Sequence, residues 1–133
     1  MHAIGVSGTG QPAIARYFCA MKDTSPLRPL DQTARDTARK LLVQSRHAAL
    51  AVMLPDGGQP MVSRIGLATT GQGAPLTLIS DLAPHTTAIE ANPACSLLLG
   101  EPGARGDPLT PPRLTLQAQA RFVPRDSGEH AAL

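Results

Sequence analysis

Apolar residues recur every three or four positions just after residue 31. This spacing puts them on one face of a helix, and they are Ala34, Ala38, Leu41 and Leu42. Asp31 stands where the helix would begin, and aspartate is a favoured capping residue there. The pattern therefore predicts a helix over residues 31–45.

Beyond residue 46 the apolar residues form short runs bounded by glycine and proline, which is typical of β-strands. The predicted strands cover residues 47–54, 60–70, 75–80, 94–100 and 113–123. A second helix is predicted over residues 84–92, because Pro84 suits a first helical position and a helix ends before Pro93. Another helix begins near Asp126.

Strands joined by tight turns favour antiparallel pairing, and five of them with one inserted helix suggest a small closed barrel. The predicted fold class is mainly β with flanking helices. We expect one domain over residues 30–133, with its C-terminal part, a last helix and strand, missing. Apolar residues show no clear periodicity over residues 1–29, and we expect an irregular, non-native extension there. One hypothesis is that translation begins at Met21.

Composition narrows the classes of function. Aromatic residues make up only 2% of the chain, which excludes a stacking platform for single-stranded nucleic acid. The net charge is +2 and the arginines are scattered, so nothing indicates a nucleic-acid partner. We expect no membrane span and no signal peptide. Cys19 and Cys95 are far apart and belong to no metal-binding pair, which favours a reducing cytoplasm.

The segment from Leu78 to Pro93 has the pattern of a strand end, a hydroxyl-bearing turn and the start of a helix. Free N–H groups in the first turn of a helix favour an anion such as phosphate. Ser80 ends the strand, and His85 and Thr86 occupy that first turn. The segment predicts a phosphate site, and the alternative is an ordinary capped helix with a surface histidine.

Two further segments place polar side chains on predicted strands. Ser63 and Arg64 are adjacent, so they point to opposite faces of their strand. Arg113 and Thr115 follow a proline-rich loop and share one face of the last strand. Each segment is a candidate ligand contact, and solvated polar positions are the alternative.

The chain offers few acid–base groups of its own. Its histidines form no metal-ligating pattern with glutamate or cysteine, so we expect no metal site. Neither paired carboxylates nor a nucleophile motif occur. Any chemistry therefore falls to a cofactor.

Several sequence blocks follow one another in order between about residues 26 and 133. They are Arg46-His47-Ala48-Ala49-Leu50-Ala51-Val52, Gly58-x-Pro60-x-x-Ser63-Arg64, Ile79-Ser80-x-Leu82-Ala83-x-His85-Thr86, Asn92-Pro93-x-x-Ser96-Leu97-Leu98, Gly106-Asp107-Pro108-Leu109 and Pro112-Arg113-Leu114-Thr115. Together they resemble the pyridoxamine 5′-phosphate oxidase-related, FMN-binding split-barrel family. The resemblance is greatest to the branch that includes haem-utilisation proteins.

This resemblance implies an antiparallel, Greek-key-like split β-barrel that forms a homodimer with FMN at the subunit interface. It implies that the strand bearing Ser63 and Arg64 touches the flavin or its phosphate. The cofactor-binding residues that it implies are Ser63, Arg64, Ser80, His85, Thr86, Arg113 and Thr115. The last two would face the flavin ring from the dimer-related side.

The chain departs from the oxidases of that family at two basic positions. His85-Thr86 stands where they carry Arg-Lys, and Ala68 or Thr69 stands where they carry a lysine. A phosphate bound here would have less charge compensation, which argues against oxidation of pyridoxamine phosphate itself. Three functions remain: an FMN-dependent oxidoreductase of unknown small-molecule substrate, a haem-binding or haem-degrading protein, and a cofactor-free dimeric binding module.

Overall fold

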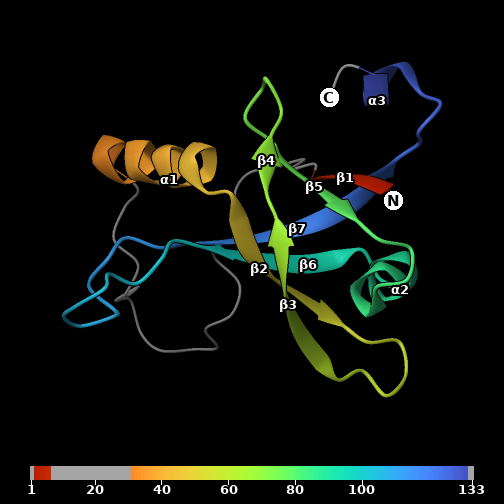
Figure 1. The fold of residues 1–133 in the computed structure, drawn as a ribbon, viewed down its shortest axis with the longest axis horizontal. Coiled ribbons are helices and arrows are strands. Elements are labelled where there is room, and N and C mark those ends of the chain that lie inside the picture. The colour runs from red at the N-terminus through yellow and green to blue at the C-terminus, as the bar shows by residue number, and fades with distance from the viewer. Residues whose placement is uncertain (1, 7–30, 132–133) are drawn as a thin grey trace, which may run out of the picture.

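The computed structural model describes residues 2–6 and 31–131 (Figure 1). In these residues three helices flank the strands: α1 (Gln32–Gln44), α2 (Pro84–Ala91) and α3 (Gly128–Ala131). The strands are β1 (His2–Val6), β2 (His47–Met53), β3 (Pro60–Gly66), β4 (Ala68–Thr69), β5 (Pro75–Ile79), β6 (Ala94–Leu99) and β7 (Leu114–Val123). Cys19 and the predicted start at Met21 lie outside the described residues.

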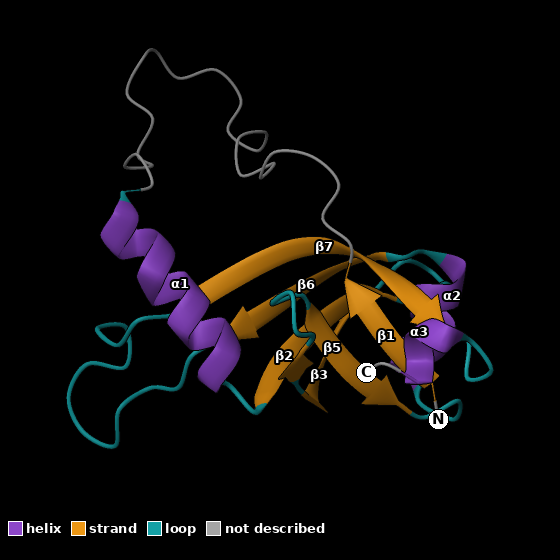
Figure 2. Ribbon diagram, turned by 90° about the horizontal axis from the view of Figure 1, so that it is seen from above, coloured by secondary structure: helices purple, strands orange, loops and turns teal. Residues whose placement is uncertain are grey.

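The strands form one sheet in the order β3-β2-β6-β7-β1-β5-β4, and its pairings are antiparallel. β3 also contacts β5, which brings the two ends of the sheet together. Figure 2 shows the strands curving around a common interior, with α1 at one end and α2 and α3 at the other. The predicted fold class, mainly β with flanking helices in a small barrel, is confirmed.

The interior of the curved sheet is the hydrophobic core. Aliphatic side chains fill it, as a chain with so few aromatics requires; the buried ones are Ala48, Leu50, Val52, Ile65, Leu67, Ile79, Ala88, Ile89, Leu97 and Leu99. They lie at alternate positions of the strands because successive side chains point to opposite faces. In β7 half-buried apolar residues alternate with exposed polar ones, as the sequence predicted.

Three helices were expected: those over 31–45 and 84–92 are present within one residue of the expected bounds, and the one expected near Asp126 begins at Gly128. Asp31 caps α1, since its carboxylate accepts a hydrogen bond of 2.7 Å from the Ala34 N–H. The side chains of α1 are only half-buried at most, and Leu42 packs against the core. Pro84 occupies the first turn of α2, whose inward side chains include Ala88 and Ile89.

The structure differs from the sequence prediction at two places. The predicted strand over 60–70 is broken at Leu67, which is buried and whose N–H donates to the Arg46 carbonyl instead of to a strand partner. The second difference is β1, in a segment for which the sequence predicted no regular element. Its partners are β5 and β7, so no local pattern could reveal it.

Candidate functional site

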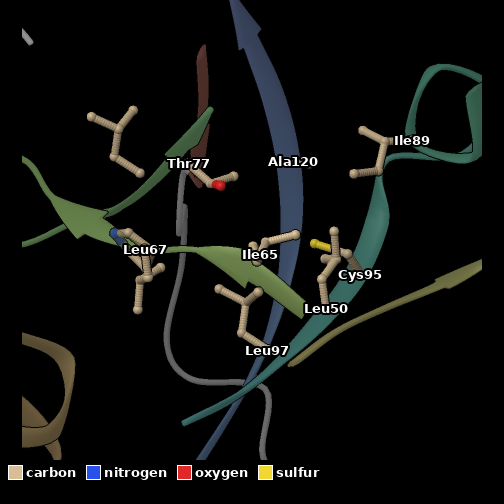
Figure 3. Close-up of a pocket in the computed structure, with 10 residues that line it drawn as sticks. Leu50, Ile65, Leu67, Thr77, Ile89, Cys95, Leu97 and Ala120 are labelled. Atoms are coloured by element: carbon tan, nitrogen blue, oxygen red, sulfur yellow. The ribbon is translucent and has the colours of Figure 1, made fainter. Parts of the chain in front are cut away.

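The cavity among the described core residues is too small for a cofactor. The cavity shown in Figure 3 has a volume of about 10 Å³ and is lined almost entirely by core side chains such as Leu50, Ile65 and Leu97. A space of this size holds at most one water molecule. Cys95 also lines it, and burial raises the pKa of the Cys95 thiol, which keeps the sulfur protonated at neutral pH. This cavity therefore does not hold a flavin or a haem.

Ser63 and His85 are brought together outside the apolar core. Ser63 pairs in register with Leu50, so it points to the core-facing side of β3, where α2 also lies. Its hydroxyl shares a hydrogen bond of 3.0 Å with Nδ1 of His85. This contact joins the middle of β3 to the first turn of α2, across 22 positions of sequence.

This arrangement buries one ring nitrogen of His85 and lowers the pKa of the imidazole. Its Nε2 atom is buried and has no hydrogen-bond partner among the described residues. Leaving such an atom unsatisfied costs about 1–3 kcal/mol. Burial also lowers the pKa of His85 below its ordinary value of 6.5, so the imidazole is neutral at pH 7. At neutral pH an anion at the first turn of α2 would therefore interact with the helix dipole but not with a positively charged imidazolium.

The pKa of His85 makes the stability of the protein depend on pH. In the unfolded chain the imidazole titrates near 6.5, and in the folded chain it titrates lower. Between these two pH values the unfolded chain binds more protons, so acidification stabilises it relative to the folded protein. The free energy of unfolding should therefore fall as the pH drops from 7 toward 5, and His85→Asn should reduce that slope. Urea titrations at several pH values measure this, and identical slopes in both proteins would refute it.

Ser80 and Thr86 are close together at the turn between β5 and α2. The Thr86 side chain is 1% exposed, and its hydroxyl donates to the Ser80 carbonyl at 2.5 Å. The Thr86 N–H donates to the Ala83 carbonyl at 2.9 Å. The Ser80 hydroxyl, which is exposed, accepts from the Leu82 N–H at 3.2 Å. The structure thus uses Thr86 to shape the turn from within, and it leaves Ser80 at the surface.

The start of α2 is open compared with that of α1. Its N-cap residue is Ala83, which supplies no side-chain hydrogen bond, and no acidic residue occupies the first turn. Asp31 fills the equivalent place on α1. Pro84 has no N–H and the Thr86 N–H already donates to the Ala83 carbonyl, so the uncapped end offers an anion chiefly the positive end of the helix dipole.

Arg64 and Thr115 lie on the outer face of the sheet, opposite to Ser63. The register runs from Arg64 on β3 across β2 and β6 to Thr115 on β7. Three strand spacings of about 4.8 Å separate them by ~14 Å in one subunit. Both are exposed, as is Arg113, whose guanidinium donates to the Leu109 carbonyl at 2.7 Å. One chain therefore divides the predicted site residues between the two faces of its sheet.

These residues fit a flavin phosphate in part. The open start of α2, the Ser80 hydroxyl and the Ser63–His85 pair supply neutral donors. Arg64 is an exposed cation on the same strand as Ser63, but it lies on the opposite face of the sheet. Ser63, Ser80 and His85 are the residues that would hold the cofactor, while Thr86 would act by supporting the turn.

The sequence analysis did not predict a second polar cluster at the other end of the barrel. Nε2 of His47, at the start of β2, lies 2.6 Å from Oε1 of Glu101, just after β6. With Arg46 and the end of α1 they line a cleft of about 300 Å³. The two residues are 54 positions apart, so no sequence spacing could have joined them. Among the described residues no group of three or more His, Cys, Asp or Glu could hold a metal ion.

The curved antiparallel sheet with the strand–turn–helix beside it has the form of a split β-barrel. A family profile described as pyridoxamine 5′-phosphate oxidase matches residues 34–133. The chain belongs to this family. No curated protein matches the chain. In the part of the chain that the structure describes, no helix is long and apolar enough to cross a membrane.

Solved structures extend this comparison to haem proteins. A protein of unknown function from Agrobacterium tumefaciens is 31% identical, with a TM-score of 0.68 over 82% of this chain and 47% of its own. HutZ, a haem storage protein from Vibrio cholerae, is 26% identical, with a TM-score of 0.61 over 75% and 68%. A haem-binding protein from Mycobacterium smegmatis is 29% identical, with a TM-score of 0.60 over 80% and 41%. The chain thus spans less than half the length of two of these relatives and resembles the haem-utilisation branch of the family.

Proposed function

We propose that this protein is an FMN-binding oxidoreductase of the pyridoxamine 5′-phosphate oxidase superfamily that acts on a small molecule in the cytoplasm. The observation that carries the proposal is the open start of α2 beside the Ser63–His85 pair. It combines hydroxyl groups with the positive end of a helix dipole, which suits a phosphate. FMN would supply the redox chemistry, because none of the twenty side chains readily carries out hydride transfer by itself.

The outer face of the sheet supports a homodimer with the cofactor at its interface. Val62 is 67% exposed, Leu98 46% and Met53 43%, and they share that face with Arg64 and Thr115. Apolar side chains of this size gathered on one sheet face are typical of an interface between subunits. Pairing two such faces would let Arg113 and Thr115 of one subunit approach the flavin of the other.

The lack of positive charge at the start of α2 argues against pyridoxamine phosphate as the substrate. His85 is neutral at pH 7 and Thr86 is engaged within the fold, where the oxidases carry a basic pair. A doubly charged substrate beside the cofactor phosphate would lack compensating charge. We therefore propose a divergent flavoprotein with another substrate.

Haem is the second candidate ligand, and the two haem proteins among the similar structures favour it. An absorption spectrum of the purified protein, followed by titration with FMN and with haem, separates the candidates. We expect yellow protein with flavin bands that persist after desalting. Colourless protein that takes up no FMN would refute the flavin proposal. A Soret band on haem titration would then favour haem, and an intact dimer that binds neither would favour a cofactor-free binding module.

A further inference from the structure

A long loop joins β6 to β7 and ends on Arg113, which the family resemblance predicts to face the flavin. It runs over residues 100–113, and most of its side chains are exposed. Figure 2 shows it projecting from the barrel at the end where α1 lies. Exposed loops are more mobile than the strands that they connect unless specific contacts hold them. The position of Arg113 therefore depends on the contacts of this loop.

The two ends of the loop meet closely at its base. Leu99 and Leu114 form the last register pair of β6 and β7. The next residue, Gly100, has a φ of +105°, and a Cβ atom there would lie 2.5 Å from the Pro112 carbonyl oxygen. Because the backbones approach at a spacing that only glycine allows, a contact that fixes the first residues of the loop also constrains its last ones.

Such a contact is made by Glu101, the residue after Gly100. Its Oε1 atom lies 2.6 Å from Nε2 of His47, the first residue of β2. Since β2 pairs with β6, this hydrogen bond ties the loop to the strand beside the one that it leaves. The two side chains are 39% and 65% exposed, and an exposed pair of this kind adds little to global stability. We therefore expect the pair to act on the loop more than on the fold.

Arg113 is also held from inside the loop. Its Nη1 atom donates to the Leu109 carbonyl at 2.7 Å. The Asp107 carboxylate accepts from the Leu109 N–H at 2.9 Å, and the Asp107 carbonyl accepts from the Thr110 N–H at 3.1 Å. Within the described residues the guanidinium has no other hydrogen bond, so Nη2 and Nε can still donate to a ligand.

We propose that His47 and Glu101 are positioning residues: their hydrogen bond fixes the loop over residues 100–113 and so places Arg113 for contact with the cofactor of the partner subunit. This role rests on the proposed function, in which Arg113 of one subunit approaches the flavin of the other. A loop that is fixed in advance avoids the entropic cost of ordering it when the cofactor binds. Breaking the pair should therefore loosen the loop and weaken FMN binding together.

Limited trypsin digestion of the full-length protein without FMN tests the hold on the loop. The bond after Arg105 lies in the loop, and its cleavage rate follows the population of the opened loop. His47→Ala should raise this rate about two- to fivefold, the range for one exposed pair. His47→Gln, whose amide can still donate to Glu101, should restore the parent rate. Glu129→Gln, which weakens the ion pair with Arg121 away from the loop, is the matched control and should leave the rate unchanged. An unchanged rate in His47→Ala would overturn the proposal.

FMN titration of the same proteins tests the positioning of Arg113. His47→Ala should weaken FMN binding about two- to fivefold, and His47→Gln should bind FMN as the parent does. In an Arg113→Ala background His47→Ala should have no further effect, because the pair acts through Arg113.

The outcomes separate this role from the proposed function. Unchanged FMN affinity in His47→Ala, or an equal loss of affinity in the Arg113→Ala background, would overturn the positioning role and leave the FMN site standing. Parent protein that binds no FMN would refute the proposed function and the role of Arg113 with it. The cleavage rates would still decide whether the His47–Glu101 pair holds the loop.

Discussion

Thr86→Glu should unfold the protein and abolish FMN binding with it. The Thr86 side chain is 1% exposed and donates to the Ser80 carbonyl at the turn into α2. Glutamate there would bury an unpaired carboxylate and remove the hydroxyl donor. A buried charge without a partner costs about 3–5 kcal/mol, which is a large part of the stability of a small domain. Urea denaturation followed by FMN titration measures both effects.

Thr87→Glu is the matched control, because Thr87 is the next residue of α2 and is exposed. Its effect on stability should stay within about 0.5 kcal/mol, as for other surface substitutions. If the start of α2 holds a phosphate, the added carboxylate should still weaken FMN binding by electrostatic repulsion. Thr86→Glu protein as stable as the parent would contradict the structure. Unchanged FMN affinity in Thr87→Glu would contradict the phosphate site alone.

Gly100→Ala should destabilise the protein by about 2–5 kcal/mol, the sum of left-handed backbone strain and overpacking. Gly100 has a φ of +105°, and a Cβ atom there would lie 2.5 Å from the Pro112 carbonyl oxygen and 2.9 Å from the Arg113 Cα. These are backbone atoms, so they cannot move aside as a flexible side chain could. The substitution should also displace Arg113 at the entrance to β7.

Gly58→Ala separates the clash from the backbone strain. Gly58 also has a positive φ, +66°, but a Cβ atom there would meet nothing within 4 Å. We expect it to cost only about 1–2 kcal/mol, the strain of a left-handed non-glycine residue. Midpoints of thermal or urea unfolding compare the two variants. Equal destabilisation of the two variants would show that the clash with Pro112 contributes nothing to the loss of stability in Gly100→Ala.

Helices α1 and α2 and the central strands could be derived from the sequence because their sequence signals are local. The apolar spacing of α1, its Asp31 cap and the alternation in β7 each repeat within one element. The first turn of α2 could also be located, because Pro84 marks it. The break at Leu67 could not be derived, because a distant carbonyl, that of Arg46, takes its N–H.

For the candidate site, too, the sequence indicated which residues matter but not which contacts they make. The residue types and the family resemblance pointed to Ser63, Ser80, His85 and Thr86 as one site. The sequence treated Thr86 as a ligand donor, whereas the structure engages its hydroxyl inside the turn. The neutral state of His85 follows from burial, which no sequence spacing reports. The separation of Arg64 from Ser63 was predictable, because adjacent strand residues face opposite ways.

The sequence by itself determined the fold class of this protein: an aliphatic, mainly antiparallel barrel with flanking helices. Those properties depend on composition and on periods of a few residues. Only the tertiary structure decided which distant groups meet. It paired Ser63 with His85, joined His47 to Glu101 at the ends of the neighbouring strands β2 and β6, and placed residues 2–6 between β5 and β7. The reason is that sheet register and curvature bring these segments together, and neither is encoded in any single stretch of chain.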